Sequence, residues 1–310
     1  MSLSSDNFTA LIYLRDQARK WKNITFITLI IAFIILIKVS LVDSDDKLSN
    51  LSEDNDFIAE IDLDGVIFRN KYRSNILQDI AKKDNIKAVI ININSPGGGI
   101  VGSEILYKNI KEISKSKPVI AVLQSVAASG GYMTAIAADY IIAHNGTLTG
   151  SIGVIIQSTE ITEMANKLGV TFNNYKSSQL KGTPSPFEKS NPIVDQAVKD
   201  SIEDSYGFFI ELVKNARKDK IKPENLPKVT DGRIFTGRQA LKLGLVDKIG
   251  SEKEALEYLE TEYQIQDLDI KTISLKKSEN KLLDKIINSD SAIGKFLNKH
   301  NSKKQLMAIW

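Results

Sequence analysis

The feature that most constrains the fold is an alternation of short apolar runs with helical patterns from residue 57 onward. Apolar runs without polar alternation suit strands buried on both faces, and strand–helix alternation requires right-handed crossovers between parallel strands. We therefore predict an α/β domain with a mostly parallel sheet. The expected elements are strand 57–68, helix 76–83, strand 87–93, helix 100–114, strand 118–123, helix 129–138, strands 140–143 and 153–157, helix 190–219 and shorter helices within 237–260.

An apolar segment near the N-terminus predicts a membrane anchor. Residues 24–42 would reach about 29 Å as a helix, close to the hydrocarbon thickness of a bilayer. Lys38 lies one turn from the end, where its stem can extend to the interface. Basic residues precede the segment and aspartates follow it, which predicts a cytoplasmic leader at 1–22 and a single transmembrane anchor at 23–42. A cleaved signal is the alternative, but the leader is long and no small-x-small cleavage site follows.

The remaining boundaries come from composition. Residues 43–56 are polar and acidic and predict a linker, followed by a globular domain at 57–270. The tail at 271–310 holds nine lysines and three acidic residues, and its apolar residues over 282–297 have helical spacing. We predict an amphipathic helix there. Packing between protomers, contact with an anionic membrane surface and an unpacked tail remain its three possible roles.

Composition also excludes several kinds of chemistry. The chain has no cysteine, which rules out disulfides, a thiolate nucleophile and cysteine-based metal sites. With two histidines, His144 and His300, most histidine-rich metal sites are excluded as well. The net charge is only +3, and the basic excess lies in the two ends, which argues against a nucleic-acid partner. We expect no metal and no cofactor.

Two glycine-rich turns carry the candidate chemistry. The sequence SVAASGGY at 125–132 places Ser129 after a buried strand and before a helix, and NSPGGG at 94–99 has the same setting. A serine at a helix N-terminus lies beside backbone N–H groups that can stabilise a developing negative charge. Because parallel strands end at the same edge of a sheet, we expect the two turns to meet. Either turn alone would indicate only a tight turn.

A nucleophilic serine needs a base, and the residues alone leave its identity open. His144 follows Ser129 by 15 residues but has no evident carboxylate to orient it. The segment 175–187 offers Lys176 and Lys181. A lysine must be desolvated, or lie near a positive dipole, to bring its pKa toward about 7. From composition alone, all three are ordinary surface residues.

Four motifs in order resemble the signatures of the short form of the signal peptide peptidase A (SppA) family. They are NSPGG at 94–98, VAASGGY at 126–132, TGSIGV at 149–154 and DGRIFTGRQALKLGLVDKIG at 231–250. The similarity covers about residues 57–260, and the predicted anchor is consistent with it. The resemblance implies that this chain is a bacterial serine protease with a Ser–Lys dyad. It also implies a Clp protease/crotonase-like fold of repeated β-β-α units, here preceded by one transmembrane helix.

The resemblance also implies roles for individual residues. By position, Ser129 would be the catalytic nucleophile and Lys181 the general base. The N–H groups of Gly98 and Gly130 would form the oxyanion hole, and Ser151 would orient the base. Lys176 matches a non-catalytic position. The sequence departs from the family pattern at Gly182, where an acidic residue is frequent, and at His144, where asparagine is common. Neither departure removes a catalytic atom.

The function implied by the resemblance is a membrane-anchored serine endopeptidase that degrades remnant signal peptides and other apolar segments. It would be a single-pass protein of the bacterial inner membrane with a cytoplasmic N-terminus, an extracytoplasmic protease domain and a ring-like homo-oligomeric assembly. Two other classes are considered. A crotonase-like acyl-CoA enzyme is disfavoured by the predicted export anchor, and a catalytically inactive or partner-dependent membrane scaffold would share the fold. A related peptidase branch, which works with stomatin-like membrane partners, is a further alternative close to the first of these functions.

Overall fold

The structure is a computed structural model that describes residues 5–41 and 55–276, with the side chains of the first helix described over 13–33. The chain divides into two units, Met1–Glu53 and Asp54–Trp310, and each is described by itself. The predicted amphipathic helix at 282–297 and most of the predicted linker lie outside the described residues.

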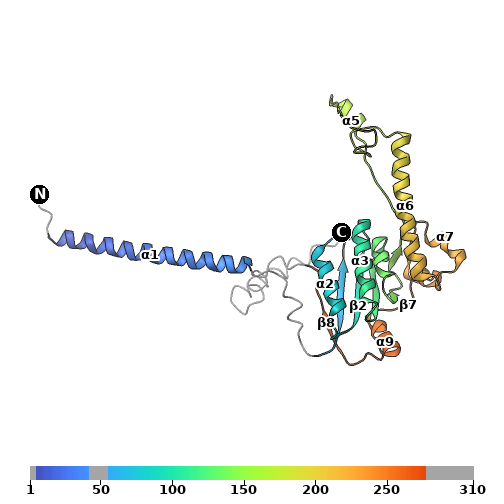
Figure 1. Cartoon of the computed structure of the whole chain (residues 1–310), viewed down its shortest axis with the longest axis horizontal. Helices are drawn as coiled ribbons and strands as arrows, with labels where there is room; N and C mark the ends of the chain where they lie inside the picture. The colour runs from blue at the N-terminus through green and yellow to red at the C-terminus, as the bar shows by residue number, and fades with distance from the viewer. Residues whose placement is uncertain (1–4, 42–54, 277–310) are drawn as a thin grey trace. The chain divides into compact units, whose positions relative to one another are not determined.

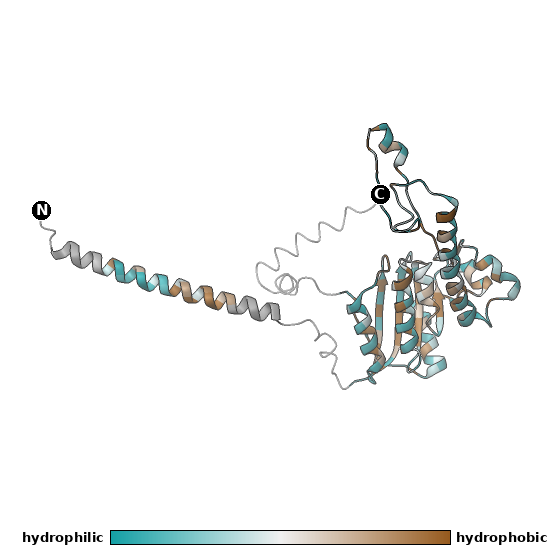
Figure 2. Ribbon diagram, turned by 45° about the horizontal axis from the view of Figure 1, so that its top comes forward, coloured by the Kyte–Doolittle hydropathy of each residue, from teal (hydrophilic) through white to brown (hydrophobic). Residues whose placement is uncertain are grey.

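The first unit contains one long helix, α1 (Ser5–Leu41), which continues from the predicted leader into the predicted anchor. Figure 2 shows that the coloured part of this helix changes from hydrophilic residues to hydrophobic residues along the chain. No helix within the described residues has the length and apolar character needed to cross a membrane. The side chains of residues 34–42, which belong to the predicted apolar span, lie outside the described residues.

The second unit is built on an eight-stranded sheet (Figure 1). Its strand order is β6-β5-β3-β2-β1-β8, with β4 pairing to β3 and to β7. Every pair is parallel except β5 with β6, so the predicted mostly parallel sheet of an α/β protein is confirmed. The strands are β1 (Phe57–Asp64), β2 (Ile86–Ser95), β3 (Val119–Ala128), β4 (Tyr140–Ala143), β5 (Leu148–Gly150), β6 (Ile234–Thr236), β7 (Lys248–Ile249) and β8 (Asp269–Thr272).

Helices pack on the sheet through its two apolar faces. Figure 1 shows α2 and α3 in front of the central strands, and Leu259 of α9 packs with Ile58 and Ile90 on a sheet face. Successive strand residues point to opposite faces, so the continuous apolar runs are buried on both sides. The helices are α2 (Lys71–Lys82), α3 (Ile100–Ile113), α4 (Gly130–Ala135), α5 (Thr162–Lys167), α6 (Pro192–Arg217), a 3₁₀ turn (Pro223–Asn225), α7 (Leu226–Val229), α8 (Gly237–Leu243) and α9 (Glu252–Tyr263).

Several strands differ from the sequence prediction. β1 ends at Asp64 and not at residue 68, and β5, β6, β7 and β8 were not predicted. The strand expected at 153–157 is absent, and residues 151–161 have no regular structure. Gly150 and Ser151 have positive φ values of 83° and 48°, which turn the chain away from the sheet after β5. The strand expected at 118–123 continues to Ala128, because its second half pairs with β5 although its side chains are no longer uniformly apolar. β8 crosses the predicted boundary between residues 270 and 271.

Residues 154–191, called here the projecting segment, leave the sheet before α6 begins. Figure 1 shows that this segment extends away from the sheet beside the first part of α6, with α5 at the tip farthest from the sheet. Its large apolar side chains are exposed, including Ile155, Leu168 and Tyr175, whose exposed fractions are 79%, 73% and 95%. Apolar surface of this kind is typical of a contact surface for another molecule.

A buried ion pair joins the end of α6 to the loop before β7. Arg217 donates two hydrogen bonds of 2.9 Å to the Asp247 carboxylate, and their side chains are 3% and 6% exposed. Asp247 also accepts from Lys220 and from the backbone N–H of Ile141. Burial by itself would raise the pKa of Asp247, but the bonds and charge of Arg217 outweigh burial and hold this pKa below its ordinary value. The pair therefore ties α6 to the sheet.

We predict that Asp247→Asn lowers the free energy of unfolding by about 3–5 kcal/mol, because it leaves Arg217 buried without a charged partner. Since folding lowers the pKa of Asp247, its ionised form contributes stability at pH values above the unfolded pKa of about 4. That contribution should disappear as pH falls through the lower folded pKa. Urea unfolding at pH 7 and pH 3 measures both effects.

Glu112→Gln is the control for this prediction, because the Lys115–Glu112 pair is exposed at 68% and 60%. An exposed pair of this kind contributes about 0–1 kcal/mol. Equal losses for Asp247→Asn and Glu112→Gln would contradict the assignment of Asp247 as a structural anchor.

Candidate active site

The two glycine-rich turns meet at one edge of the sheet, as the sequence predicts. One follows β2 and the other follows β3, which are neighbouring parallel strands. A Cβ atom added to Gly97 would lie 2.7 Å from the backbone nitrogen of Gly130 and 2.9 Å from the Cβ of Ser129. Gly97 also has a φ of +102°, which side chains rarely adopt. The first turn therefore fits against the second only with glycine at this position.

Ser129 occupies a strained backbone position between β3 and α4. Its φ and ψ are 53° and −119°, and a positive φ is uncommon for a residue other than glycine. Two backbone hydrogen bonds hold it there: its N–H donates to the carbonyl of Gly150 at 2.8 Å, and its carbonyl accepts from Met133 at 2.9 Å. Strain maintained by surrounding structure in this way is typical of functional sites.

The backbone amides of Gly98 and Gly130 lie beside Ser129. A Cβ atom on Gly130 would be 3.3 Å from the nitrogen of Gly98 and 2.1 Å from the Oγ of Ser103. A Cβ atom on Gly98 would be 2.1 Å from the carbonyl oxygen of Ile67. Because Gly130 is the first residue of α4, its N–H has no acceptor within the helix. Two amides next to a serine hydroxyl suit a negative charge that develops on a carbonyl oxygen.

A pocket of about 920 Å³, called here the Ser129 pocket, opens at this edge. Of the predicted site residues, Gly98, Ser129 and Ser151 line it. Ser151 follows β5 with a φ of 48°, and its N–H donates to the carbonyl of Arg233 at 2.9 Å. The other lining residues are Pro96, Gly99, Ile100, Ile152, Gly153, Val154, Ile155, Ile202, Tyr206, Thr230, Asp231 and Gly232. The aliphatic side chains give the pocket an apolar wall.

The candidate bases lie elsewhere. Lys181 is exposed on a turn of the projecting segment, where its N–H donates to the carbonyl of Ser178, and it does not line the Ser129 pocket. Lys176 forms an ion pair with Glu188, and His144 is exposed just after β4. No lysine, arginine or histidine of the described residues lines the Ser129 pocket. A single chain therefore places Gly98, Ser129, Gly130 and Ser151 together but leaves Lys181 apart.

Sequence reasoning did not identify the contribution of α6 to the Ser129 pocket. Ile202 and Tyr206 lie four residues apart, so they share one face of the helix. The Tyr206 hydroxyl donates to the carbonyl of Thr230, which joins α6 to the loop that carries Asp231 and Gly232. The only sequence signal for this part of the pocket is the DGR at the start of the motif at 231–250, to which the sequence alone assigns no role.

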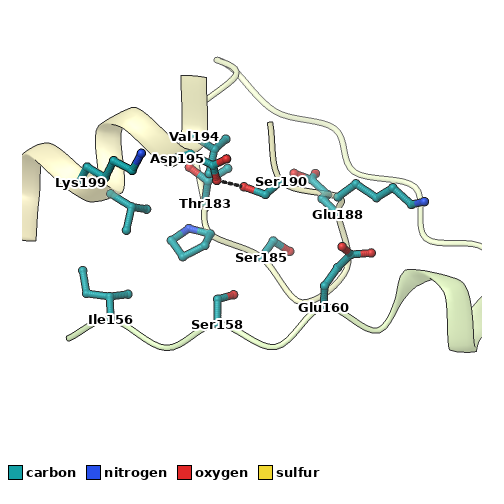
Figure 3. Close-up of a pocket in the computed structure, with 13 residues that line it drawn as sticks. Ile156, Ser158, Glu160, Thr183, Ser185, Glu188, Ser190, Val194, Asp195 and Lys199 are labelled. Carbon is teal, nitrogen blue, oxygen red and sulfur yellow. Dashed lines mark hydrogen bonds between the residues drawn. The ribbon is translucent and has the colours of Figure 1, made fainter. Parts of the chain in front are cut away.

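A second pocket, of about 360 Å³, lies within the projecting segment and is called here the segment pocket (Figure 3). Ile156, Ser158 and Glu160 border one side of it, and residues 183–185 and 188–190 border another. The beginning of α6 closes it, where Ser190 donates a hydrogen bond to Asp195. Within residues 5–41 and 55–276, no group of three or more histidine, aspartate and glutamate side chains is arranged to hold a metal ion.

A family model and two named relatives point to one family. Residues 111–266 match the model of Peptidase family S49. A protein of Methanocaldococcus jannaschii named "Putative protease MJ0651" is 33% identical over 209 residues, which is 67% of each chain. A protein of Enterococcus faecium named "Putative signal peptide peptidase SppA" is 34% identical over 232 residues, covering 73% of this chain and 67% of that protein.

A solved structure of a membrane-bound stomatin-specific protease is 16% identical. It covers 73% of this chain and 100% of its own, with a TM-score of 0.47.

We predict that Gly98→Ala disrupts the site, because its Cβ would collide with the backbone of Ile67. The expected loss is about 1–3 kcal/mol of unfolding free energy, as for overpacking, together with loss of reactivity at Ser129. Gly99→Ala is the matched control: the neighbouring glycine has a φ of −65° and open space around its Cβ position. Thermal unfolding and labelling by a fluorophosphonate report the two effects. Equal behaviour of the two variants would contradict the close packing of the turns.

Proposed function

The chain belongs to peptidase family S49, and from this premise we propose that it is a membrane-anchored serine endopeptidase with a Ser129–Lys181 dyad. The serine peptidase class rests on the family. The nucleophile assignment rests on one observation above the others: Ser129 is held in a strained turn beside the amides of Gly98 and Gly130, within a pocket.

The proposed mechanism uses these groups in sequence. The Oγ of Ser129 attacks the carbonyl carbon of a peptide bond while the neutral amine of Lys181 takes the hydroxyl proton. The amides of Gly98 and Gly130 donate hydrogen bonds to the resulting oxyanion. Lys181 then gives its proton to the departing amine, which leaves an acyl-enzyme on Ser129. A water molecule then loses a proton to Lys181 and attacks the ester carbonyl. Lys181 returns this proton to the Oγ of Ser129 as the C–O bond breaks and the acid leaves, and Ser151 orients the lysine throughout.

The dyad requires Lys181 to reach the Ser129 pocket, and we propose that a homo-oligomer achieves this. Lys181 is carried by the projecting segment, whose exposed apolar side chains include Leu168 and Tyr175. A lysine acts as a general base only in a desolvated environment, whereas Lys181 is exposed in a single chain. If a neighbouring copy covered the projecting segment, Lys181 would be desolvated. In the same contact, Lys181 would enter the Ser129 pocket of that neighbouring copy.

Substrates are proposed to be remnant signal peptides and other apolar segments. Ile100, Ile152 and Ile202 give the pocket aliphatic walls, which favour apolar side chains. An extended peptide at the sheet edge would add backbone hydrogen bonds in the manner of strand addition. The uncharged run at residues 23–37 supports a single-pass anchor in the bacterial inner membrane, with an extracytoplasmic protease domain. Anchoring would concentrate the enzyme beside membrane-bound substrates.

One observation favours a second candidate, a partner-dependent or inactive membrane scaffold. The Ser129 pocket of the single chain lacks a basic side chain, so activity depends on whatever brings one to it. The two candidates differ in a direct measurement, because only the peptidase cleaves an apolar signal-sequence peptide in its purified, assembled form.

We predict that Ser129→Ala and Lys181→Ala each lower peptide cleavage by at least about 10³-fold while folding and assembly persist. Lys181→Arg should be nearly as damaging as Lys181→Ala, because arginine keeps its proton. Product formation from a signal-sequence peptide measures the loss, and light scattering measures assembly. Full activity of Ser129→Ala would refute the nucleophile, and full activity of Lys181→Arg would refute the base.

A mixing experiment separates the two routes by which Lys181 can reach Ser129. Chains with Ser129→Ala and chains with Lys181→Ala are each expected to be inactive. The two kinds of chain are mixed before purification so that they assemble together. If each site takes its serine from one copy and its lysine from the next, random mixing should restore about a quarter of the wild-type sites. If each chain supplies both groups to its own site, the mixture should remain inactive. Failure to restore activity would contradict delivery from a neighbouring copy.

A further inference from the structure

Lys181 lies on a loop whose two ends are held together by an ion pair. Lys176 precedes the loop and Glu188 follows it, and the ammonium of Lys176 bonds to the carboxylate of Glu188. The side chains are 20% and 28% exposed, so the pair is more protected than a surface ion pair. Beside it, the rings of Phe172 and Phe187 pack with their centroids 4.5 Å apart. The polypeptide between these contacts, residues 177–187, is called here the Lys181 loop.

The hydrogen bonds within the Lys181 loop are local. The N–H of Lys181 donates to Ser178, and both the N–H and the hydroxyl of Thr183 donate to Leu180. One backbone bond ties the loop to a distant residue, from the N–H of Ile161 to the carbonyl of Pro186 at 2.9 Å.

The segment pocket is lined by residues 183–185 of the loop and by residues 188–190, which follow the loop (Figure 3). Thr183, Ser185 and Glu188 lie around this cavity together with side chains from two other parts of the chain. The loop is thus not packed closely on this side. Its closed ends therefore have a large share in fixing where Lys181 projects.

We propose that the Lys176–Glu188 ion pair is a positioning element for the general base: it closes the Lys181 loop and fixes the direction from which Lys181 enters a Ser129 pocket. The inference rests on the proposed function, because it assigns a role relative to Lys181. Lys176 itself is a positioning residue, since its ammonium is already bound to Glu188.

The physical reason is geometric. A general base must lie within hydrogen-bond distance of the proton that it removes, and small displacements of a catalytic group lower the rate steeply. Releasing Glu188 from Lys176 would open the loop at its base and spread Lys181 over more positions. Binding of the peptide to the apolar walls of the Ser129 pocket would be little changed. The turnover number kcat should therefore fall while KM stays nearly constant.

The test compares four variants of the full-length, assembled protein on the same signal-sequence peptide. Glu188→Gln keeps the shape of the side chain but removes its charge, and it should lower kcat about tenfold or more with KM within about twofold. The reciprocal exchange, Lys176→Glu with Glu188→Lys, should recover most of that loss, because the ion pair forms again in the opposite sense. Lys176→Arg should keep near wild-type kcat, since arginine pairs with a carboxylate but does not accept a proton.

The matched control is Glu163→Gln. Glu163 pairs with Lys189 in the same projecting segment, but this pair is exposed at 75% and 65% and does not close the Lys181 loop. Its kcat should stay within about twofold of wild type. Light scattering and thermal unfolding of each variant show that assembly and folding persist, so that a lost rate reports the position of Lys181.

The outcomes distinguish this inference from the proposed function. Wild-type kcat in Glu188→Gln, or no recovery in the reciprocal exchange, would overturn the positioning role while leaving the dyad intact. Loss of activity in Lys176→Arg together with full activity in Lys181→Arg would instead show that Lys176 is the base, and would overturn the proposed dyad. Loss in Glu188→Gln, recovery in the exchange and activity in Lys176→Arg would together establish the positioning role.

Discussion

The structure around the active site depends on direct backbone packing between two turns that follow neighbouring parallel strands. The 2.7 Å approach of a Gly97 Cβ position to the nitrogen of Gly130 leaves no room for a side chain. This contact brings the amide of Gly98 beside that of Gly130, and it holds both next to the hydroxyl-bearing turn of Ser129. A pair of amides fixed by packing needs no rearrangement when charge develops, which is the condition for effective electrostatic stabilisation.

Much of this arrangement could be predicted because it follows from local rules. Continuous apolar runs separated by helical patterns predict a parallel sheet, and the shared edge of parallel strands predicts that the turns at 94–99 and 129–131 meet. Strand β4 was predicted at its observed bounds, and helices α3 and α6 within three residues of theirs. The motifs supplied Ser151, whose approach to Ser129 depends on pairing of β5 with the end of β3 and has no local signal in composition.

The remaining features were not predictable from the sequence because they depend on tertiary contacts. Residues 153–157 have the composition of a strand, but the positive φ values of Gly150 and Ser151 direct them away from the sheet. The face of α6 that carries Tyr206 lines the pocket only because the helix is joined to the loop of Thr230. Composition predicts that Lys181 is a surface residue, and it is exposed. The spacing of Ser129 and Lys181 along the chain does not show that the lysine lies outside the pocket of the serine.

These observations divide the catalytic machinery into two parts with different physical properties. The proposed nucleophile and the proposed oxyanion-hole amides belong to the sheet edge, where buried strands and closely packed turns hold the backbone. The proposed base belongs to the projecting segment, whose apolar side chains are exposed and whose Lys181 loop depends on the Lys176–Glu188 pair for closure. If these proposed roles hold, an enzyme built in this way would be inactive as a separate chain, because Ser129 would have no base and Lys181 is exposed to solvent. Under the proposed function, assembly itself would complete the active site, and a protease that acts on unfolded apolar segments would be restrained until it is assembled.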